Sequence, residues 1–110
     1  SIAKAVVPLI AHDDIEVRNL AGDVLIKLGP DAVDALYPYL KDAAADNRKF
    51  ACDIIGLSNN PTAIPKVRAI LSDTDDNVRC AAVEALGFLK ADDLLGDIIA
   101  MYDDEPVRPY

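Results

Sequence analysis

An arginine returns along this chain at nearly constant intervals, each time shortly after a group of acidic residues. The arginines are Arg18, Arg48, Arg79 and Arg108, and they are spaced by 30, 31 and 29 residues. A fixed period of this size is typical of a solenoid, in which each repeat is a small helical or stranded unit that packs only on its neighbours. The period therefore predicts the architecture of the chain, but it says little about function.

The residues after each arginine follow the period of an α-helix. Alanine stands three residues after the first three arginines, and a large aliphatic residue stands seven residues after them. These positions, and the sixth and tenth, lie on one face of a helix. The face comprises Ala21, Val24, Leu25 and Leu28, then Ala51, Ile54 and Ile55, then Ala82, Ala85, Leu86 and Leu89. The small alanine lets a neighbouring backbone come close, while the aliphatic residues fill the space between helices.

A second apolar segment follows each of these helices after a break rich in Gly, Pro, Asn or Asp. We expect second helices at about 32–41, 63–72 and 94–102. Their inward positions are predicted to be Val33, Leu36 and Leu40, then Ile64, Val67 and Leu71, then Leu95, Ile98 and Tyr102. Pro8 and Pro38 fall inside second helices, where a proline removes a hydrogen bond and bends the helix. We expect these prolines to set the curvature of the second-helix layer.

Composition supports a single all-α domain over residues 1–110. Hydrophobic residues make up 52% of the chain, which is enough for one continuous core, and strand-like alternation is not sustained. We expect a partial repeat at 1–12, repeats at about 13–41, 42–72 and 73–102, and a stub at 103–110. Because an uncapped solenoid end exposes its apolar side, we expect either a longer array or a homo-oligomer formed through the ends.

The best-formed repeat resembles a known family. Residues 73–87, with Val78, Arg79 and Ala82 in register, are similar to the short HEAT-like repeat of phycobilisome lyase subunits and many bacterial scaffold proteins. Residues 13–21 give a second good copy, and 42–56 a weaker one with Asn47 in place of Val. The resemblance covers essentially the whole chain. It implies a right-handed α-solenoid of about three antiparallel helical hairpins whose second helices line the concave side.

Acidic residues crowd the turns that precede the first helices. An Asp in such a turn caps free amide groups, and its charge suits the helix dipole. Each arginine lies about one turn into its helix, where it can reach an Asp of its own repeat or of the adjacent one. We expect a ladder of Asp–Arg pairs that fixes the register between repeats. This structural role is favoured over a ligand site, because repeat motifs produce periodic charge routinely.

One stretch resembles part of a calcium-binding EF-hand loop. Its positions 1, 3, 5 and 12 are Asp73, Asp75, Asn77 and Glu84. Position 6, which requires Gly for a sharp turn, is Val78, and a helix starting near Asp76 carries Glu84 away from the other ligands. We therefore expect no calcium site. His12 is the single histidine, so no pair of imidazoles can hold a metal, and the iron-dependent hydroxylase activity of one HEAT-like relative is not implied.

Catalytic chemistry is not indicated elsewhere. Neither Cys52 nor Cys80 has a nearby histidine to activate it, and the chain has no glycine-rich phosphate loop. The sequence therefore predicts no catalytic residue, no metal and no cofactor, and a protein that is not an enzyme. Two unpaired cysteines in a helical chain favour a reducing compartment, and thus a cytoplasmic location. No apolar run approaches the length of about 20 residues that crosses a bilayer.

Charge narrows the class of partner. The formal net charge of −8 disfavours nucleic acid and anionic membranes, which attract clustered Lys and Arg. A protein or peptide with a basic surface is the natural complement, because opposite charge speeds association. A second interpretation is that the acidity keeps a small apolar stack soluble.

These features favour a non-catalytic scaffold or adaptor that binds a protein through the concave second-helix face. Tyr and Arg are enriched at interface hot spots. The candidate partner-binding residues on the outward side of the second helices are Asp34, Tyr37, Lys66, Arg68 and Asp97. The alternative, implied by the family resemblance, is a fragment or accessory subunit of a lyase-type enzyme that handles a chromophore.

Overall fold

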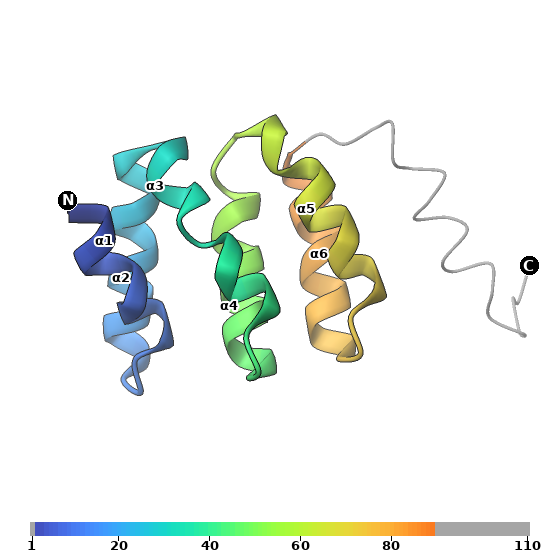
Figure 1. Ribbon diagram of the computed structural model, residues 1–110, viewed down its shortest axis with the longest axis horizontal. Helices are drawn as coiled ribbons and strands as arrows, with labels where there is room; N and C mark the ends of the chain where they lie inside the picture. Colours follow the sequence, from blue (N-terminus) through green and yellow to red (C-terminus); the bar gives the residue numbers. More distant parts are fainter. Residues whose placement is uncertain (1, 90–110) are drawn as a thin grey trace, which may run out of the picture.

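A computed structural model describes residues 2–89 of the chain. All elements in this range are helical, and they stand side by side in a row (Figure 1). The three long elements are the predicted first helices, α2 (Ile15–Leu28), α4 (Ala45–Gly56) and α6 (Asp76–Phe88). No helix within residues 2–89 has both the length and the apolar character needed to cross a membrane.

The first helices begin where the acidic turns predict. The Asp14 side chain caps α2 by accepting a 2.8 Å hydrogen bond from the Glu16 amide. The Asp75 side chain caps α6 in the same way, accepting from the Asn77 and Val78 amides at 2.8 and 3.1 Å. Ala44 has the extended backbone of a cap, but its side chain cannot accept a hydrogen bond. The start of α4 is therefore the weakest of the three.

The second segments are shorter and more irregular than predicted. They comprise α1 (Ile2–Val6) with η1 (Val7–Ala11), α3 (Pro30–Asp34) with η2 (Tyr37–Lys41), and η3 (Pro61–Ala63) with α5 (Ile64–Ala69) and η4 (Ile70–Ser72). Pro8 and Pro38 do not simply bend a helix; the chain changes from α to 3-10 winding around them, because proline lacks the amide proton of the α-helical bond. Ala69 occupies the position equivalent to Pro38 in the third segment, and there the α-helix α5 continues to this residue.

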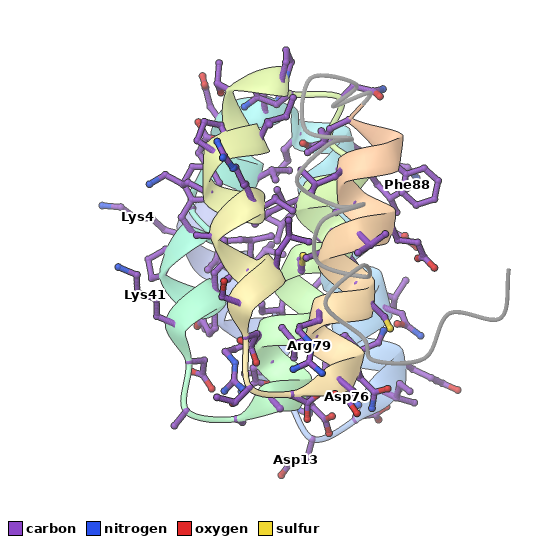
Figure 2. All side chains as sticks on the ribbon, turned by 90° about the vertical axis from the view of Figure 1, so that its right-hand side faces the viewer. Lys4, Asp13, Lys41, Asp76, Arg79 and Phe88 are labelled. Carbon is purple, nitrogen blue, oxygen red and sulfur yellow. The ribbon has the colours of Figure 1, made fainter. Side chains whose placement is uncertain are left out.

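The elements form two layers. α2 packs against η1, α4 against η2 and α6 against η4, so each first helix lies on the second segment that precedes it. Figure 2 shows the layers edge-on, with Lys4 and Lys41 pointing outward from the second segments and Phe88 pointing outward from α6 on the other side. The predicted all-α solenoid is confirmed.

The core is a continuous apolar seam between the two layers. At its centre Leu25, Ile55 and Leu86 are at most 1% exposed, and the predicted alanines beside them are also buried. Val33, Leu36 and Leu40 are buried as predicted. In the second segment at 63–72 the prediction is confirmed for Val67, which is fully buried, whereas Ile64 and Leu71 are only half-buried. The other buried side chains are Ala63 and Ile70, which lie in the 3-10 turns η3 and η4, where the winding is tighter than in an α-helix.

The sixth position after each arginine packs against the preceding first helix. Ile54 lies beside Gly22 of α2, and Ala85 lies beside Gly56 of α4. Val24 occupies this position in α2, and its side chain is 37% exposed. Its neighbours on the same side of the helix, Leu20 and Leu28, are also exposed, at 64% and 44%. The prediction that Val24 and Leu28 are core residues is therefore wrong, because no described first helix precedes α2.

Side-chain size at this position sets the spacing of the first helices. A Cβ atom placed on Gly56 would lie 2.8 Å from both Cα and Cβ of Ala85, so α4 and α6 approach each other closely. Between α2 and α4 the larger Ile54 and Phe50 face Gly22, and a Cβ there would lie 3.1 Å from Cδ1 of Ile54. Figure 1 shows the result, with α6 set closer to α4 than α2 is.

Candidate partner-binding face

Two surfaces of the solenoid carry charged residues in a regular arrangement. One is the turn edge, formed by the turns 12–14, 42–44 and 73–75 that precede the first helices. The other is the second-helix face, the outward surface of the second segments α1, η1, α3, η2, α5 and η4. Figure 2 shows Asp13, Asp76 and Arg79 at the turn edge, well separated from Lys4 on the second-helix face.

The three described turns share one hydrogen-bond pattern. The residue six positions before each arginine accepts a bond from the amide two residues further on. Asp42 accepts from the Ala44 amide at 3.0 Å, and Asp73 accepts from the Asp75 amide at 2.9 Å. His12 takes this place in the first turn, where Nδ1 accepts from the Asp14 amide at 3.0 Å. The equivalence of His12 to Asp42 and Asp73 was not predicted, although its spacing of six residues from Arg18 could have revealed it.

One joint of the predicted Asp–Arg ladder is fully formed. Arg48 Nε and Nη2 donate to Oδ2 and Oδ1 of Asp73 at 2.9 and 3.1 Å, and the two side chains are 15% and 9% exposed. Arg48 Nη1 also donates to the carbonyl oxygens of Asp42 and Ala43 at 2.9 and 3.2 Å. The hydrogen bonds from Arg48 hold the pKa of Asp73 below its usual value. Arg48 thus ties the turn of its own repeat to the turn of the next.

Arg18 and Arg79 do not repeat this pairing within residues 2–89. Arg79 donates to the Asp73 carbonyl oxygen at 2.7 Å and pairs with Asp76, so both of its partners belong to its own turn. The acidic residues of the following turn lie outside the described residues. Arg18 Nε is buried, and it has no hydrogen-bond partner in the described part of the chain. Asp42, which is equivalent to Asp73, accepts a 3.1 Å hydrogen bond from the side-chain amide of Asn47 in its own repeat.

The carboxylates that resemble a calcium loop serve the turn itself. Asp73 binds Arg48, and Asp75 caps α6, while Glu84 lies within α6 and points to solvent. Among residues 2–89, no three His, Cys, Asp or Glu side chains are grouped so that they could hold a metal ion. Cys52 is fully buried, and this burial raises the pKa of its thiol to about 12, whereas Cys80 is exposed.

The second-helix face contains an open apolar hollow of about 440 Å³ between η2 and α5. Its lining is Tyr37, Pro38, Leu40 and Lys41 from η2, with Pro65, Lys66, Ala69 and Ile70 from α5 and η4. Two of the predicted partner-binding residues meet here, because Lys66 Nζ lies 5.0 Å from the centroid of the Tyr37 ring. This distance is typical of a cation–π contact.

Asp34, a third predicted partner-binding residue, contacts Tyr37 but does not itself line the hollow. The Asp34 carboxylate accepts a hydrogen bond from the side-chain amide of Asn60 at 3.2 Å. This bond links α3 to the loop between α4 and η3 in the next repeat. Burial, together with the hydrogen bond and the charge of Asp34, raises the pKa of Tyr37 to about 12. The Tyr37 side chain is therefore neutral at physiological pH, and its ring lines the hollow beside Lys66. Asp34 is half-buried, and it interacts with the hydroxyl group of Tyr37.

The remaining predictions for this face fall elsewhere. Arg68 is exposed on α5 but does not line the hollow, and Asp97 lies outside the described residues. Lys41 and Ala69 line the hollow, although neither was among the candidate residues. Lys41 could have been found from its place at the end of a second segment, next to the inward position Leu40. Ala69 gives no signal in the sequence.

Charge is divided unequally between the two surfaces. The second segments, residues 2–11, 30–41 and 61–72, carry four basic side chains and two acidic ones. These are Lys4, Lys41, Lys66 and Arg68 against Asp31 and Asp34. Residues 2–89 together carry nine basic and thirteen acidic side chains, so the acidity of this part of the chain comes from the turns and the first helices and not from the second segments.

The fold defines an α-solenoid built from helical hairpins. A family model for HEAT repeats matches residues 33–109, and this covers more than half of the sequence. The chain belongs to the HEAT-repeat family, whose members commonly bind other proteins. No curated protein matches the sequence.

Proposed function

We propose that this chain is a non-catalytic scaffold or adaptor module that binds a protein or peptide through its second-helix face. The hollow between η2 and α5 carries this proposal. Pro38 and Pro65 have fixed backbones, and the Tyr37 ring is held by its neighbours, so binding there orders few groups. An apolar recess with rigid aromatic and proline walls is the kind of surface in which interface anchors bind.

The first-helix side offers a less suitable surface. A hollow of about 380 Å³ lies between α2 and α4, lined by Ile15, Arg18, Asn19, Asp46, Lys49 and Phe50. Most of these side chains are polar, and Lys49 is already paired with Asp53 at 2.8 Å. A partner would have to replace these contacts and the bound water before gaining any of its own. We therefore assign the binding role to the second-helix face.

Three further expectations from the sequence belong to this proposal. The net charge of −8 supports a partner whose surface is basic, since net charge governs approach at long range. The exposed thiol of Cys80 supports a reducing, cytoplasmic compartment. The exposed side chains Leu20, Val24 and Leu28 support self-association, because in the next two repeats the sixth position after the arginine is covered by a preceding first helix.

Site-specific photo-crosslinking in cells of the source organism tests the binding face. A photoreactive amino acid replaces Ala69, which lines the hollow, and in a matched control it replaces Asp23, which is exposed on α2. We expect protein adducts from position 69 and far fewer from position 23. Adducts that form at position 23 and not at position 69 would assign binding to the first-helix side and contradict the proposal.

A further inference from the structure

The rim of the hollow has the opposite charge to the molecule as a whole. Among residues 2–89, the charged side chains that line it are Lys41 and Lys66, and none of the described lining residues is acidic. Lys41 comes from the end of η2 and points outward from the second-helix layer, as Figure 2 shows. Lys66 comes from α5. A segment bound in the hollow would therefore meet positive charge at its edge, whatever the sign of the net charge.

The floor of the hollow is apolar. Leu40 and Ile70 are 5% and 8% exposed, so they belong to the core and present only a small apolar surface. Pro38 and Pro65 form opposite walls, one from η2 and one from α5. An aromatic or large aliphatic side chain entering between the prolines would bury its surface without leaving a polar group unpaired.

Lys66 is held in a position that suits a second contact. Its ammonium group lies over the face of Tyr37, which orients the side chain but satisfies none of its three donors by a conventional hydrogen bond. A carboxylate placed at the rim could accept from this ammonium group while the cation–π contact remains. The lysine would then act as an oriented donor and not as a freely moving charge.

We propose that the hollow binds an acidic peptide segment, in which a large apolar side chain enters between Pro38 and Pro65 and neighbouring Asp or Glu carboxylates pair with Lys41 and Lys66. This inference rests on the proposed function and specifies its partner. It differs from the expectation based on net charge because charges beyond about 8 Å are largely screened at physiological salt. At contact, the local charges of the second-helix face decide the preference.

Selection from a random peptide library displayed on phage tests this inference with the full chain as bait. We expect the selected peptides to carry Asp or Glu next to an aromatic or large aliphatic residue. Their binding should be lost when Tyr37→Ala and Ala69→Arg together remove one wall and fill the hollow. Circular dichroism of that variant confirms that the helices remain.

The outcomes separate the two proposals. Selected peptides rich in Lys and Arg that still depend on Tyr37 and Ala69 would overturn the acidic partner and leave the binding face intact. Peptides that bind the double variant as well as the parent chain would overturn both proposals. A library that yields no enriched sequence would also count against both.

Charge reversal gives a quantitative test of the two lysines. Lys41→Glu and Lys66→Glu should each weaken binding of a selected acidic peptide about fivefold, as expected for loss of one exposed ion pair. Together they should favour a peptide with Lys in place of its acidic residues. Lys27→Glu makes the same change in net charge on α2, away from the hollow, and should leave affinity within about twofold. Equal weakening by Lys27→Glu would show that net charge decides the preference and would overturn the inference.

Discussion

At the scale of single residues, each turn before a first helix uses two positions with distinct tasks. The residue six before the arginine closes the turn, and the residue four before it caps the helix. His12 shows that the first task needs an acceptor and not a negative charge, since Nδ1 replaces a carboxylate oxygen. Ala44 shows that the second task can go unfilled, because the tertiary contacts of α4 hold the helix without a cap.

Filling the empty cap should stabilise the protein. Ala44→Ser places a hydroxyl where Asp14 and Asp75 have their carboxylates, and its oxygen can accept from the first amides of α4. We expect the free energy of unfolding in urea to rise by about 1 kcal/mol. Ala43→Ser, one residue earlier in the same turn, is the control and should change it by less than about 0.5 kcal/mol. An equal gain from both serines would contradict the capping role.

The Arg48–Asp73 joint should give stability a defined pH dependence. The pKa of Asp73 is lowered in the folded state by the hydrogen bonds from Arg48, so the joint stabilises the fold above the ordinary aspartate pKa of about 4. This contribution is lost as pH falls through the lowered folded-state pKa. The stability difference between the parent chain and Asp73→Asn should therefore be constant above about pH 5 and shrink below about pH 4.

Urea unfolding at several pH values measures this difference. Asp23→Asn, an exposed carboxylate on α2, serves as the matched control and should show little difference at any pH. If the gap between the parent chain and Asp73→Asn stayed constant down to pH 2, the joint would contribute nothing through its charge.

At the scale of elements, the distance between adjacent first helices depends on small residues at the contact. Ala85 packs directly against Gly56, so α4 and α6 lie close together. The larger side chains of Ile54 and Phe50 pack against Gly22, so α4 lies farther from α2. This difference offers a reason for the incomplete ladder. Where the helices are close, Arg48 reaches the next turn, and where they are farther apart, Arg18 lacks the equivalent pair.

Replacing Gly56 and Gly87 by alanine should change the free energy of unfolding in opposite directions, although both lie eight residues after an arginine of the repeat. Gly56→Ala forces a methyl group against the backbone of Ala85, and we expect it to destabilise the fold by about 1–3 kcal/mol. Within the described part of the chain, a Cβ atom at Gly87 meets no atom within 4 Å outside its own helix, so Gly87→Ala should stabilise α6 by about 0.5–1 kcal/mol. Thermal unfolding of both variants measures the effect. Similar shifts from both would show that α4 and α6 do not approach as closely as described.

The sequence predicts the elements best where the reason is local. The caps of α2 and α6, the helix starts, and the alanine and the seventh-position aliphatic residue after each arginine depend on residues a few places apart, and these predictions hold. Val24 fails because its burial depends on a neighbouring helix, which no local pattern reports. Ile64 and Leu71 fail because the 3-10 turns η3 and η4, which bury Ala63 and Ile70 instead, depart from the α-helical period used for the prediction. The hollow requires two segments from different repeats, so only Tyr37 and Lys66 were found in advance.

At the scale of the whole molecule, the solenoid separates its charges by layer. The turn edge carries the Asp-rich caps that the helices need, and the second segments carry more basic than acidic residues. A solenoid allows this because each layer is a continuous surface built from equivalent positions of successive repeats. The net charge and the charge of the binding face can therefore differ in sign.

The exposed stripe on α2 should promote association of the chain with a second copy. Leu20 is 64% exposed, and Val24 and Leu28 lie one and two turns further along. We expect light scattering to show a concentration-dependent dimer that Leu20→Lys converts to monomer. Asn19→Lys adds the same charge next to the stripe and should leave the dimer in place. A parent chain that stays monomeric at high concentration would remove this role of the stripe.

The central claim is that a partner binds on the second-helix face, over the hollow between η2 and α5. Titration of the ¹⁵N-labelled chain with a selected peptide, followed by amide chemical shifts, tests it most directly. We predict that the largest shifts cluster at residues 37–41 and 64–70, with little change along the outer side of α2 and α4. Shifts concentrated at the turn edge or between α2 and α4, with residues 37–41 and 64–70 unmoved, would contradict the account.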